Sequence, residues 1–346
     1  MQLAASEAHK LAVDVLSAHG MPREHAGIVA DHLVDAAGAG HVFAGLPRVM
    51  ALVDNLKDRP AGRPIVVDRT TPNSATIDGG GNNGYVTSLI AIDTAIEIAR
   101  DRAVAIVGVR DTWFSGRIGY YVERAAQAGF VAIHTANTQA RVAPAGGIDR
   151  IFGTNPIAFA FPCDPDPVVI DFGTAMTTWG DVLLRLKLGE PMDPGTAVDP
   201  SGEPTTDPSQ ALLGAFLPWG GHRGYGISLA AQIFGILCGS STVVDGVSDS
   251  GFFFLVFNPD LLMPLDAFKA KVAELVAHIE TSRPAPGFER VRVPGRGSAM
   301  RRAASREAGT IEVDQAVYDT LLTLRLGPSP NRADAAELSR APVSES

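Results

Sequence analysis

Cysteine is nearly absent from this sequence. Its 346 residues include 2 cysteines, Cys163 and Cys238, both in apolar surroundings. Two such cysteines are too few for a disulfide scaffold or a cysteine-rich metal cluster, and a chain of this length can bury enough surface to fold without cross-links. The histidines show no close spacing with carboxylates beyond His25, Asp31 and His32, which a polar helix face explains. No metal site is predicted.

Long apolar runs and an excess of positive charge are also missing. The longest apolar stretches, such as Phe252–Phe257, fall well short of the roughly 20 residues that a membrane-spanning helix needs. Residues 1–7 lack a basic region followed by an apolar run, so no secretory signal is expected. The 29 Lys and Arg against 38 Asp and Glu give a net charge of −9, which argues against nucleic acid or an anionic membrane as the main partner. We expect a soluble, cytoplasmic globular protein.

Apolar residues at helical spacing predict that residues 1–64 form a helical N-terminal domain. The first stripe runs from Ala8 to Leu16, and the next helix starts near Pro22. A short helix is predicted over Pro47–Leu56. The Pro/Gly-rich stretch Arg59–Pro64 then marks a domain boundary.

From Ile65 onward, short apolar strands alternate with glycine turns and helices, which predicts an α/β domain over residues 65–282. The predicted strands are Ala103–Val109, Phe130–His134, Ile157–Phe161, Val168–Ile170 and Phe252–Phe257. The predicted helices are Tyr85–Arg102, Tyr120–Ala128, a buried helix His222–Leu237 and an amphipathic helix Leu265–Ile279. We expect loops over Pro191–Pro208 and over the basic stretch Ser282–Arg306, with a flexible tail over 327–346.

One glycine motif invites a Rossmann interpretation. Residues 79–84 read Gly-Gly-Gly-Asn-Asn-Gly and precede the helix Tyr85–Arg102, and the acidic residue Asp111 lies after the next strand. The preceding strand, Asn73–Asp78, is polar, whereas a parallel core strand should be almost continuously apolar. An ordinary glycine turn before a helix is the better interpretation, so the motif does not establish a Rossmann domain.

Several longer stretches occur in a characteristic order along the chain: Val109-Arg110…Gly116…Gly119-Tyr120-Tyr121, Val142–Gly147, Gly153–Phe159, Val169-Ile170-Asp171, Asp199–Pro208, Leu217–Tyr225 and Val293-Pro294-Gly295. Over residues 6–315 this set resembles the second malate/L-lactate dehydrogenase family, which includes ureidoglycolate dehydrogenases, diketogulonate reductases and piperideine-2-carboxylate reductases. The resemblance implies an α/β, non-Rossmann fold of the malate/lactate dehydrogenase type 2 kind. It has a helical N-terminal domain and a mixed, largely antiparallel sheet domain.

The resemblance also implies a homodimer that binds NADPH or NADH in a cleft between its domains, with residues 283–326 returning toward that cleft. Three segments match cofactor-contacting parts of the family: Phe172, Gly173, Thr174 and Ala175; His222, Arg223 and Gly224; Arg301 and Arg306. Successive amides in the first segment would form an anion-binding nest. Without a cofactor, these segments would be a strand exit and a solvated basic loop.

This chain departs from the family where acid–base chemistry is usually performed. The family pattern Gly-His-Asp-Ser-His-Gly is replaced by residues 40–45, which place Phe43 at the serine and Ala44 at the second histidine. A second family histidine aligns with Phe114. Neither phenylalanine nor alanine can donate or accept a proton, so both usual catalytic histidines are missing. Phe43, Trp113 and Phe114 instead predict an aromatic pocket for a flat or cationic substrate.

Four residues are predicted to bind a small carboxylate substrate: Arg48, Arg141, Ala44 and Phe114. A planar arginine fork suits a 2-oxo or 2-imino acid, although Arg48 could equally form a surface ion pair. Asp199 and His41 are the candidate catalytic groups. Asp-Pro-Ser-Gly is also an ordinary turn, and a lone histidine is often structural.

Three functions remain open. The first is a nicotinamide-dependent reductase of an imine or an activated carbonyl carboxylate. A cyclic imine can arrive already protonated, so its reduction asks less of an acid. The second is a 2-oxo acid reductase in which His41, Asp199, Tyr120 or a water replaces the lost acid. The third is a repurposed scaffold without redox activity, acting as a binding protein or in a non-redox reaction.

Overall fold

The computed structural model describes residues 1–57, 59, 62–247 and 249–327, so most of the tail predicted over 327–346 lies outside the described residues. The chain divides into two compact units. The first unit comprises residues 1–61 and those from 300 onward, and the second unit comprises residues 62–299. Within the described residues, no helix combines the length and apolar character needed to cross a membrane.

The first unit is mainly helical. Its helices are α1 (Ala5–Ala18), α2 (Arg23–Gly38), the short 3-10 turn η1 (Val42–Ala44), α3 (Pro47–Lys57) and α11 (Gln315–Leu324). The apolar stripe of α1 is buried, and Gly20 ends that region with a left-handed φ of 94°, as the sequence predicts. Strand β1 (Gln2–Ala4) pairs antiparallel with β12 (Thr310–Glu312), which ties the start of the chain to its C-terminal part.

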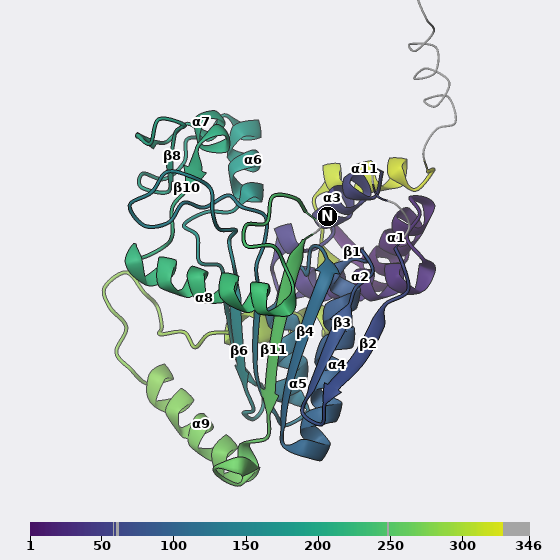
Figure 1. The fold of residues 1–346 in the computed structure, drawn as a ribbon, viewed down its shortest axis with the longest axis vertical. Coiled ribbons are helices and arrows are strands. Elements are labelled where there is room, and N and C mark those ends of the chain that lie inside the picture. Colours follow the sequence, from purple (N-terminus) through teal and green to yellow (C-terminus); the bar gives the residue numbers. More distant parts are fainter. Residues whose placement is uncertain (58, 60–61, 248, 328–346) are drawn as a thin grey trace, which may run out of the picture. The chain divides into compact units, whose positions relative to one another are not determined.

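A seven-stranded mixed sheet forms the second unit (Figure 1). Its order is β2 (Val66–Thr71), β3 (Ser74–Asp78), β4 (Val104–Thr112), β11 (Ser250–Phe257), β5 (Val131–Ala136), β6 (Ile157–Phe161) and β7 (Val168–Phe172). Only β3 and β4 pair in parallel, and every other neighbouring pair is antiparallel. The predicted mixed, largely antiparallel sheet is therefore confirmed.

Successive side chains of β4 point to opposite faces of the sheet, which explains why helices cover both faces. Ala105, Val107 and Val109 are buried in one core with α4 (Gly84–Arg102) and α5 (Gly119–Gln127). On the opposite face, a Cβ on Gly108 would lie 3.1 Å from Cys238 at the end of α8 (His222–Cys238). The sheet is thus layered between α4 and α5 on one side and α8 on the other (Figure 1).

The glycine motif lies in a βαβ crossover between β3 and β4. Several of its backbone amides are hydrogen-bonded to neighbouring backbone carbonyls. Gly79, Gly81 and Gly84 donate backbone hydrogen bonds to the carbonyls of Arg110, Asp111 and Trp113. A Cβ on Gly84 would lie 2.8 Å from the Phe114 backbone. These glycines therefore permit close chain packing, in agreement with the turn interpretation.

The remaining elements form a small lobe and the C-terminal helices. The lobe contains α6 (Trp179–Leu188), α7 (Pro208–Leu213) and a three-stranded sheet of β8 (Ala197–Val198), β9 (Pro204–Thr205) and β10 (Ala215–Phe216). The predicted loop over Pro191–Pro208 thus contains two short strands. After η2 (Pro259–Leu261), α9 (Leu265–Glu280) follows the amphipathic prediction.

Two sequence expectations are wrong. The stretch Ser282–Arg306 is not a continuous loop, because α10 spans Arg296–Ala308. Its alanine, methionine and arginine residues favour helix, a preference that the basic charge obscured. The helix predicted as buried, α8, exposes much of its apolar surface, with Ile233 55% and Leu237 72% exposed. Its uniform hydropathy could not show that only one side of the helix packs on the sheet.

Candidate functional site

The first predicted cofactor segment, Phe172–Ala175, begins at the end of the edge strand β7. Phe172 pairs with Ile157 of β6. Thr174 is fully buried, and both its amide and its hydroxyl donate to the carbonyl of Thr154, at 2.8 and 3.0 Å. The Thr174 amide is therefore used within the protein, so the anion nest expected from this segment has fewer donors than the sequence suggests.

The second predicted cofactor segment lies beside the first. Trp219 donates its amide to the Thr174 carbonyl at 3.0 Å, and Met176 donates to the Leu217 carbonyl at 2.8 Å. The rings of Phe172 and Trp219 meet edge to face with centroids 5.8 Å apart. Segments that are distant in sequence therefore form one candidate site within the second unit.

This site presents the N-terminus of α8. Gly220 and Gly221 have left-handed φ values of 58° and 60°, and no atom lies within 4 Å of the position of a Cβ on Gly221. His222 and Arg223 follow in the first turn and are exposed. A helix N-terminus with an open glycine turn and an adjacent guanidinium attracts anions such as a pyrophosphate.

One buried polar atom supports the fit to a cofactor. The indole Nε1 of Trp219 is buried and finds no hydrogen-bond partner among the described residues. A buried donor without a partner is costly, and a bound polar ligand is one way to satisfy it. Together with the open turn at Gly221, this donor makes the residues compatible with a phosphate-bearing nicotinamide cofactor.

Gly224→Ala tests how closely these segments must approach. A Cβ at this position would overlap the Trp219 backbone, which would displace the Trp219–Thr174 connection. We expect nucleotide affinity to fall about tenfold or more, with destabilisation of about 1–3 kcal/mol. Nucleotide titration and urea unfolding measure the two effects. Gly226→Ala is the control, because no atom lies within 4 Å of the Cβ position on Gly226. Equal affinities in the two variants would contradict the assigned packing role.

Arg141 contacts two neighbouring side chains through its guanidinium. Its guanidinium lies 3.7 Å from the ring centroid of Trp179 and donates to Gln139 at 2.8 Å. Desolvation, and then the nearby charge of Arg150, lower the pKa of Arg141. A partly desolvated guanidinium binds a carboxylate more strongly than an exposed one does.

Asp199 closes a turn. Its Oδ1 accepts hydrogen bonds from the Ser201 hydroxyl at 2.6 Å, the Ser201 amide at 2.8 Å and the Glu203 amide at 3.0 Å. The hydroxyl of Ser201, followed by the backbone donors, lowers the pKa of Asp199. The group is therefore a carboxylate near neutral pH, which suits a structural role better than proton donation.

Five predicted site residues belong to the first unit. His41 precedes η1, Ala44 ends it, and Arg48 is an exposed residue in the first turn of α3. Arg301 donates its Nε to the Ala39 carbonyl at 2.9 Å, and Arg306 lies 3.5 Å from Asp35. These two arginines therefore attach the C-terminal part of α10 to the end of α2.

The aromatic residues differ in what they can contact. Trp113 is 1% exposed and donates its indole N–H to the Gly81 carbonyl at 2.9 Å, so it supports the glycine turn and does not line an open pocket. Phe114 adopts a left-handed φ of 50°, and its ring centroid lies 5.7 Å from that of Trp113. Phe43, in the first unit, is 59% exposed.

Two polar residues of this region, Asp171 and Asn155, were not predicted from the sequence to be functional. Asp171 accepts a hydrogen bond from the Gly119 amide at 2.7 Å, linking the start of α5 to the cofactor segment. The surrounding protein raises the pKa of Asp171 by desolvation, although the residue keeps accessible surface. Asn155 is buried and donates to Gln232 of α8 at 2.9 Å. The sequence indicates their importance only through their positions in the Val-Ile-Asp and Gly-Thr-Asn-Pro stretches.

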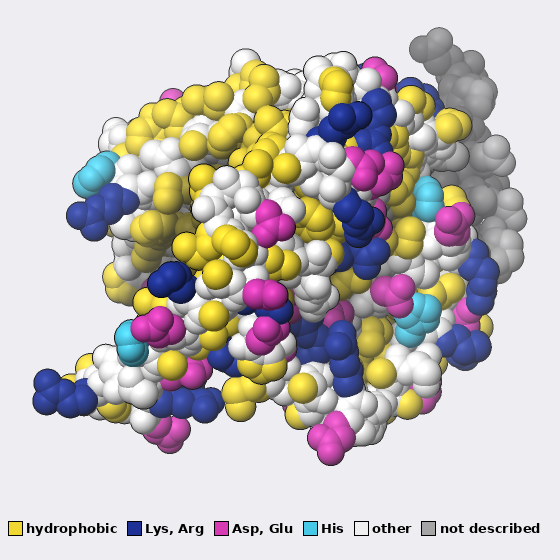
Figure 2. All heavy atoms as spheres, turned by 90° about the horizontal axis from the view of Figure 1, so that it is seen from below, with side chains coloured by type: hydrophobic (Ala, Val, Ile, Leu, Met, Phe, Trp, Pro, Cys, Tyr) yellow, Lys and Arg dark blue, Asp and Glu magenta, His cyan; other side chains and the backbone are white. Residues whose placement is uncertain are grey.

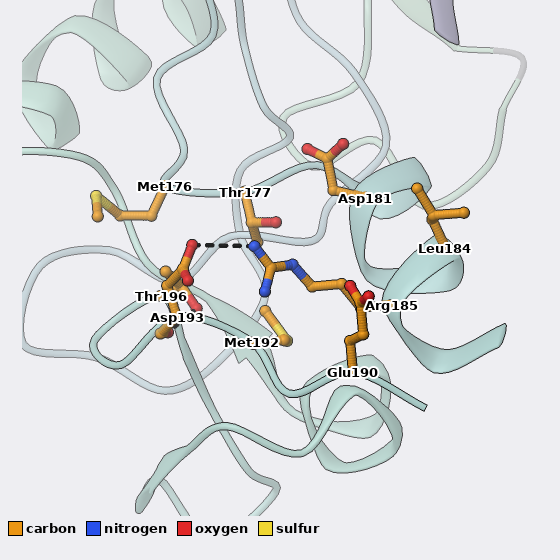
Figure 3. Close-up of a pocket in the computed structure, with 9 residues that line it drawn as sticks. All are labelled: Met176, Thr177, Asp181, Leu184, Arg185, Glu190, Met192, Asp193 and Thr196. Atoms are coloured by element: carbon orange, nitrogen blue, oxygen red, sulfur yellow. Dashed lines mark hydrogen bonds and ion pairs between the residues drawn. The ribbon is translucent and has the colours of Figure 1, made fainter. Parts of the chain in front are cut away.

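A cavity of about 280 Å³ lies in the small lobe, next to the predicted cofactor segment Phe172–Ala175 (Figure 3). Met176 and Thr177, which directly follow Ala175, form part of its lining. Arg185 extends from α6 across the cavity to Asp193 (Figure 3). The lining residues are Met176, Thr177, Asp181, Leu184, Arg185, Glu190, Met192, Asp193 and Thr196.

Comparisons with known proteins agree on one class. The profile of the malate/L-lactate dehydrogenase family matches residues 3–322. An L-sulfolactate dehydrogenase of Methanocaldococcus jannaschii is 36% identical over 325 residues, covering 90% of this chain and 93% of that protein. The NAD(+) ureidoglycolate dehydrogenase of Escherichia coli is 30% identical over 336 residues, covering 93% and 95%.

Solved structures share the fold. The sulfolactate dehydrogenase structure superposes with a TM-score of 0.82 at 34% identity, covering 94% of this chain and 96% of its own. The Δ1-piperideine-2-carboxylate reductase of Pseudomonas syringae gives 0.83 at 26% identity, covering 94% and 99%. The protein is an oxidoreductase of the dehydrogenase class. It belongs to the malate/L-lactate dehydrogenase family.

Proposed function

We propose that this protein transfers hydride between NADH or NADPH and a small 2-imino or 2-oxo carboxylate. The observation that carries the proposal is the union of Phe172–Ala175 with the α8 N-terminus through the Trp219–Thr174 hydrogen bond. These segments would hold the cofactor phosphates, with Arg223 as the adjacent cation. Arg141, in the same unit, would bind the substrate carboxylate.

The nicotinamide supplies the hydride, so the protein's task is orientation and control of one proton. Ketone reduction needs a proton at the developing alkoxide, and Ala44 and Phe114 cannot supply one. Asp199 is held as a carboxylate by its turn. We therefore place a cyclic imine ahead of a 2-oxo acid, because a protonated imine forms a neutral amine without a protein acid.

Three of the relatives supply the substrate panel. Their names specify sulfolactate, ureidoglycolate and piperideine-2-carboxylate. Purified protein is titrated with NADH and NADPH by energy transfer from tryptophan, and nucleotide oxidation is then followed with the cyclic imine, sulfopyruvate and pyruvate. Cofactor binding with imine turnover is expected. Turnover of 2-oxo acids alone would favour a replacement acid, and His41→Ala would test His41 in that role. Binding of neither nucleotide would overturn the proposal and favour a repurposed scaffold.

A homodimer is the second part of the proposal. Between Gly224 and Cys238, α8 carries no charged residue, and Leu229, Ile233 and Leu237 expose an apolar row away from the sheet. Figure 2 shows hydrophobic side chains gathered over part of the molecular surface. A contiguous apolar helix face of this kind is typical of an interface, and a second copy of the chain would cover it.

Ile233→Glu is expected to convert the dimer into monomers, because two buried carboxylates would face each other or their apolar neighbours across a symmetric interface. Light scattering after gel filtration measures the mass. Leu275→Glu provides the matched control, since Leu275 is similarly exposed on α9, at 59% against 55% for Ile233. A wild-type monomer, or a dimer that survives Ile233→Glu, would contradict this interface.

A further inference from the structure

The cavity beside the cofactor segment has the dimensions of part of a nucleotide. Sites for drug-sized ligands enclose about 300–1,000 Å³, so a cavity of about 280 Å³ suits one nucleoside and not a whole dinucleotide. Met176 and Thr177 join its wall directly to Phe172–Ala175, and the Met176 amide is bonded to Leu217, two residues before Trp219. A dinucleotide with its phosphates at that segment has its adenosine end within reach of the cavity.

The side chains suit a nucleoside. Met176, Leu184 and Met192 supply apolar surface for a flat base. Asp193 and Glu190 supply carboxylates, the groups that bind ribose hydroxyls in nucleotide sites. The cavity therefore combines a base-binding surface with hydroxyl acceptors.

The charges of the cavity lining are mostly negative. Among the described residues that line the cavity, Arg185 is the one cation, and both of its terminal nitrogens are engaged. Nη1 donates to the Pro191 carbonyl at 2.5 Å, and Nη2 lies 3.1 Å from Asp193. Asp181 and Glu190 add two further negative charges, and Asp181 also accepts from Thr178 at 2.8 Å. A 2′-phosphate would have to displace Asp193 from Arg185 beside these carboxylates.

We propose that this cavity binds the adenosine end of the cofactor and selects the 2′-hydroxyl of NADH over the 2′-phosphate of NADPH. This inference rests on the proposed function. Asp193 is the specificity-determining residue. It neutralises Arg185, and it either accepts from the ribose hydroxyl or repels a phosphate. Like charges brought together in a binding site are strongly disfavoured, whereas a hydroxyl meets an acceptor.

Direct binding tests this assignment without turnover. Dissociation constants are measured for NADH and NADPH by tryptophan energy transfer, and for 5′-AMP and adenosine 2′,5′-bisphosphate by calorimetry. The wild-type protein should bind NADH about tenfold or more tightly than NADPH, and 5′-AMP more tightly than the bisphosphate. Asp193→Asn should release Arg185 and tighten NADPH binding about fivefold or more. Adding Arg185→Gln should abolish that gain.

Asp68→Asn controls for net charge, because Asp68 is exposed on β2 and lies outside the cavity lining. Equal or tighter wild-type binding of NADPH would overturn the assignment, as would an NADH preference that Asp193→Asn and Asp68→Asn leave equally unchanged. In either case the proposed function would stand. Binding of neither nucleotide would instead overturn the proposed function, and this inference with it.

Discussion

The double variant Phe43→Ser/Ala44→His is expected to raise kcat/KM for 2-oxo acids by about 10²-fold or more. The family resemblance places a serine and a proton-donating histidine at these positions, and general acid catalysis contributes about 10²–10⁴ in rate. Phe43 is 59% exposed and Ala44 is partly exposed in η1, so both changes can be accommodated without disturbing a core.

Substrate comparison gives this experiment its specificity. A restored acid should increase turnover of pyruvate and sulfopyruvate much more than turnover of a protonated cyclic imine. NADH affinity should remain unchanged, because the variant leaves Phe172–Ala175, the α8 N-terminus, Arg301 and Arg306 as they are. Phe43→Ser/Ala44→Gln provides a control of similar size that cannot donate a proton from an imidazolium. If the histidine and glutamine variants reduce 2-oxo acids equally well, the missing-acid explanation is wrong.

Acid is expected to destabilise the protein through His134. This residue is fully buried in β5, where its ring stacks on Phe254 with centroids 3.9 Å apart and Nδ1 bonds to the Phe253 carbonyl at 3.0 Å. Nε2 finds no hydrogen-bond partner among the described residues. Desolvation disfavours the charged ring and lowers the pKa of His134 from 6.5 to about 4.

The direction follows from proton uptake. Between pH 6.5 and 4 the unfolded chain binds a proton at His134 that the folded chain excludes, so stability is complete above pH 6.5 and falls as the pH approaches 4. The loss amounts to about 3 kcal/mol. His134→Phe keeps an aromatic ring but cannot titrate. Between pH 7.5 and 4, the free energy of unfolding of this variant should therefore fall by about 3 kcal/mol less than that of the wild-type protein. Urea unfolding at pH 7.5 and 4 measures the difference, and identical pH dependence in both proteins would contradict it.

Local patterns predicted most elements. The apolar spacing of α1, the strand β6 and the hydrophobic run of β11 appear in the structure close to their expected limits. These signals are readable because a residue's burial on a helix or strand follows the period of that element. The basic charge of residues 296–308 favoured a loop prediction where α10 forms. The uniform hydropathy of α8 did not indicate which of its sides is exposed. Neither property shows which neighbours an element packs against.

The sequence by itself determined the family and the mixed α/β class, and it places Ala44 and Phe114 where the family resemblance implies histidines. Only the tertiary structure decided what individual polar groups do, because hydrogen bonds and desolvation depend on which groups the folded chain brings together. It joined Thr174 to Trp219, assigned Asp199 to a turn and Trp113 to the glycine loop, and paired Arg185 with Asp193. None of these four contacts follows a sequence period, because each depends on the particular backbone and side-chain groups that the fold brings within reach of each other.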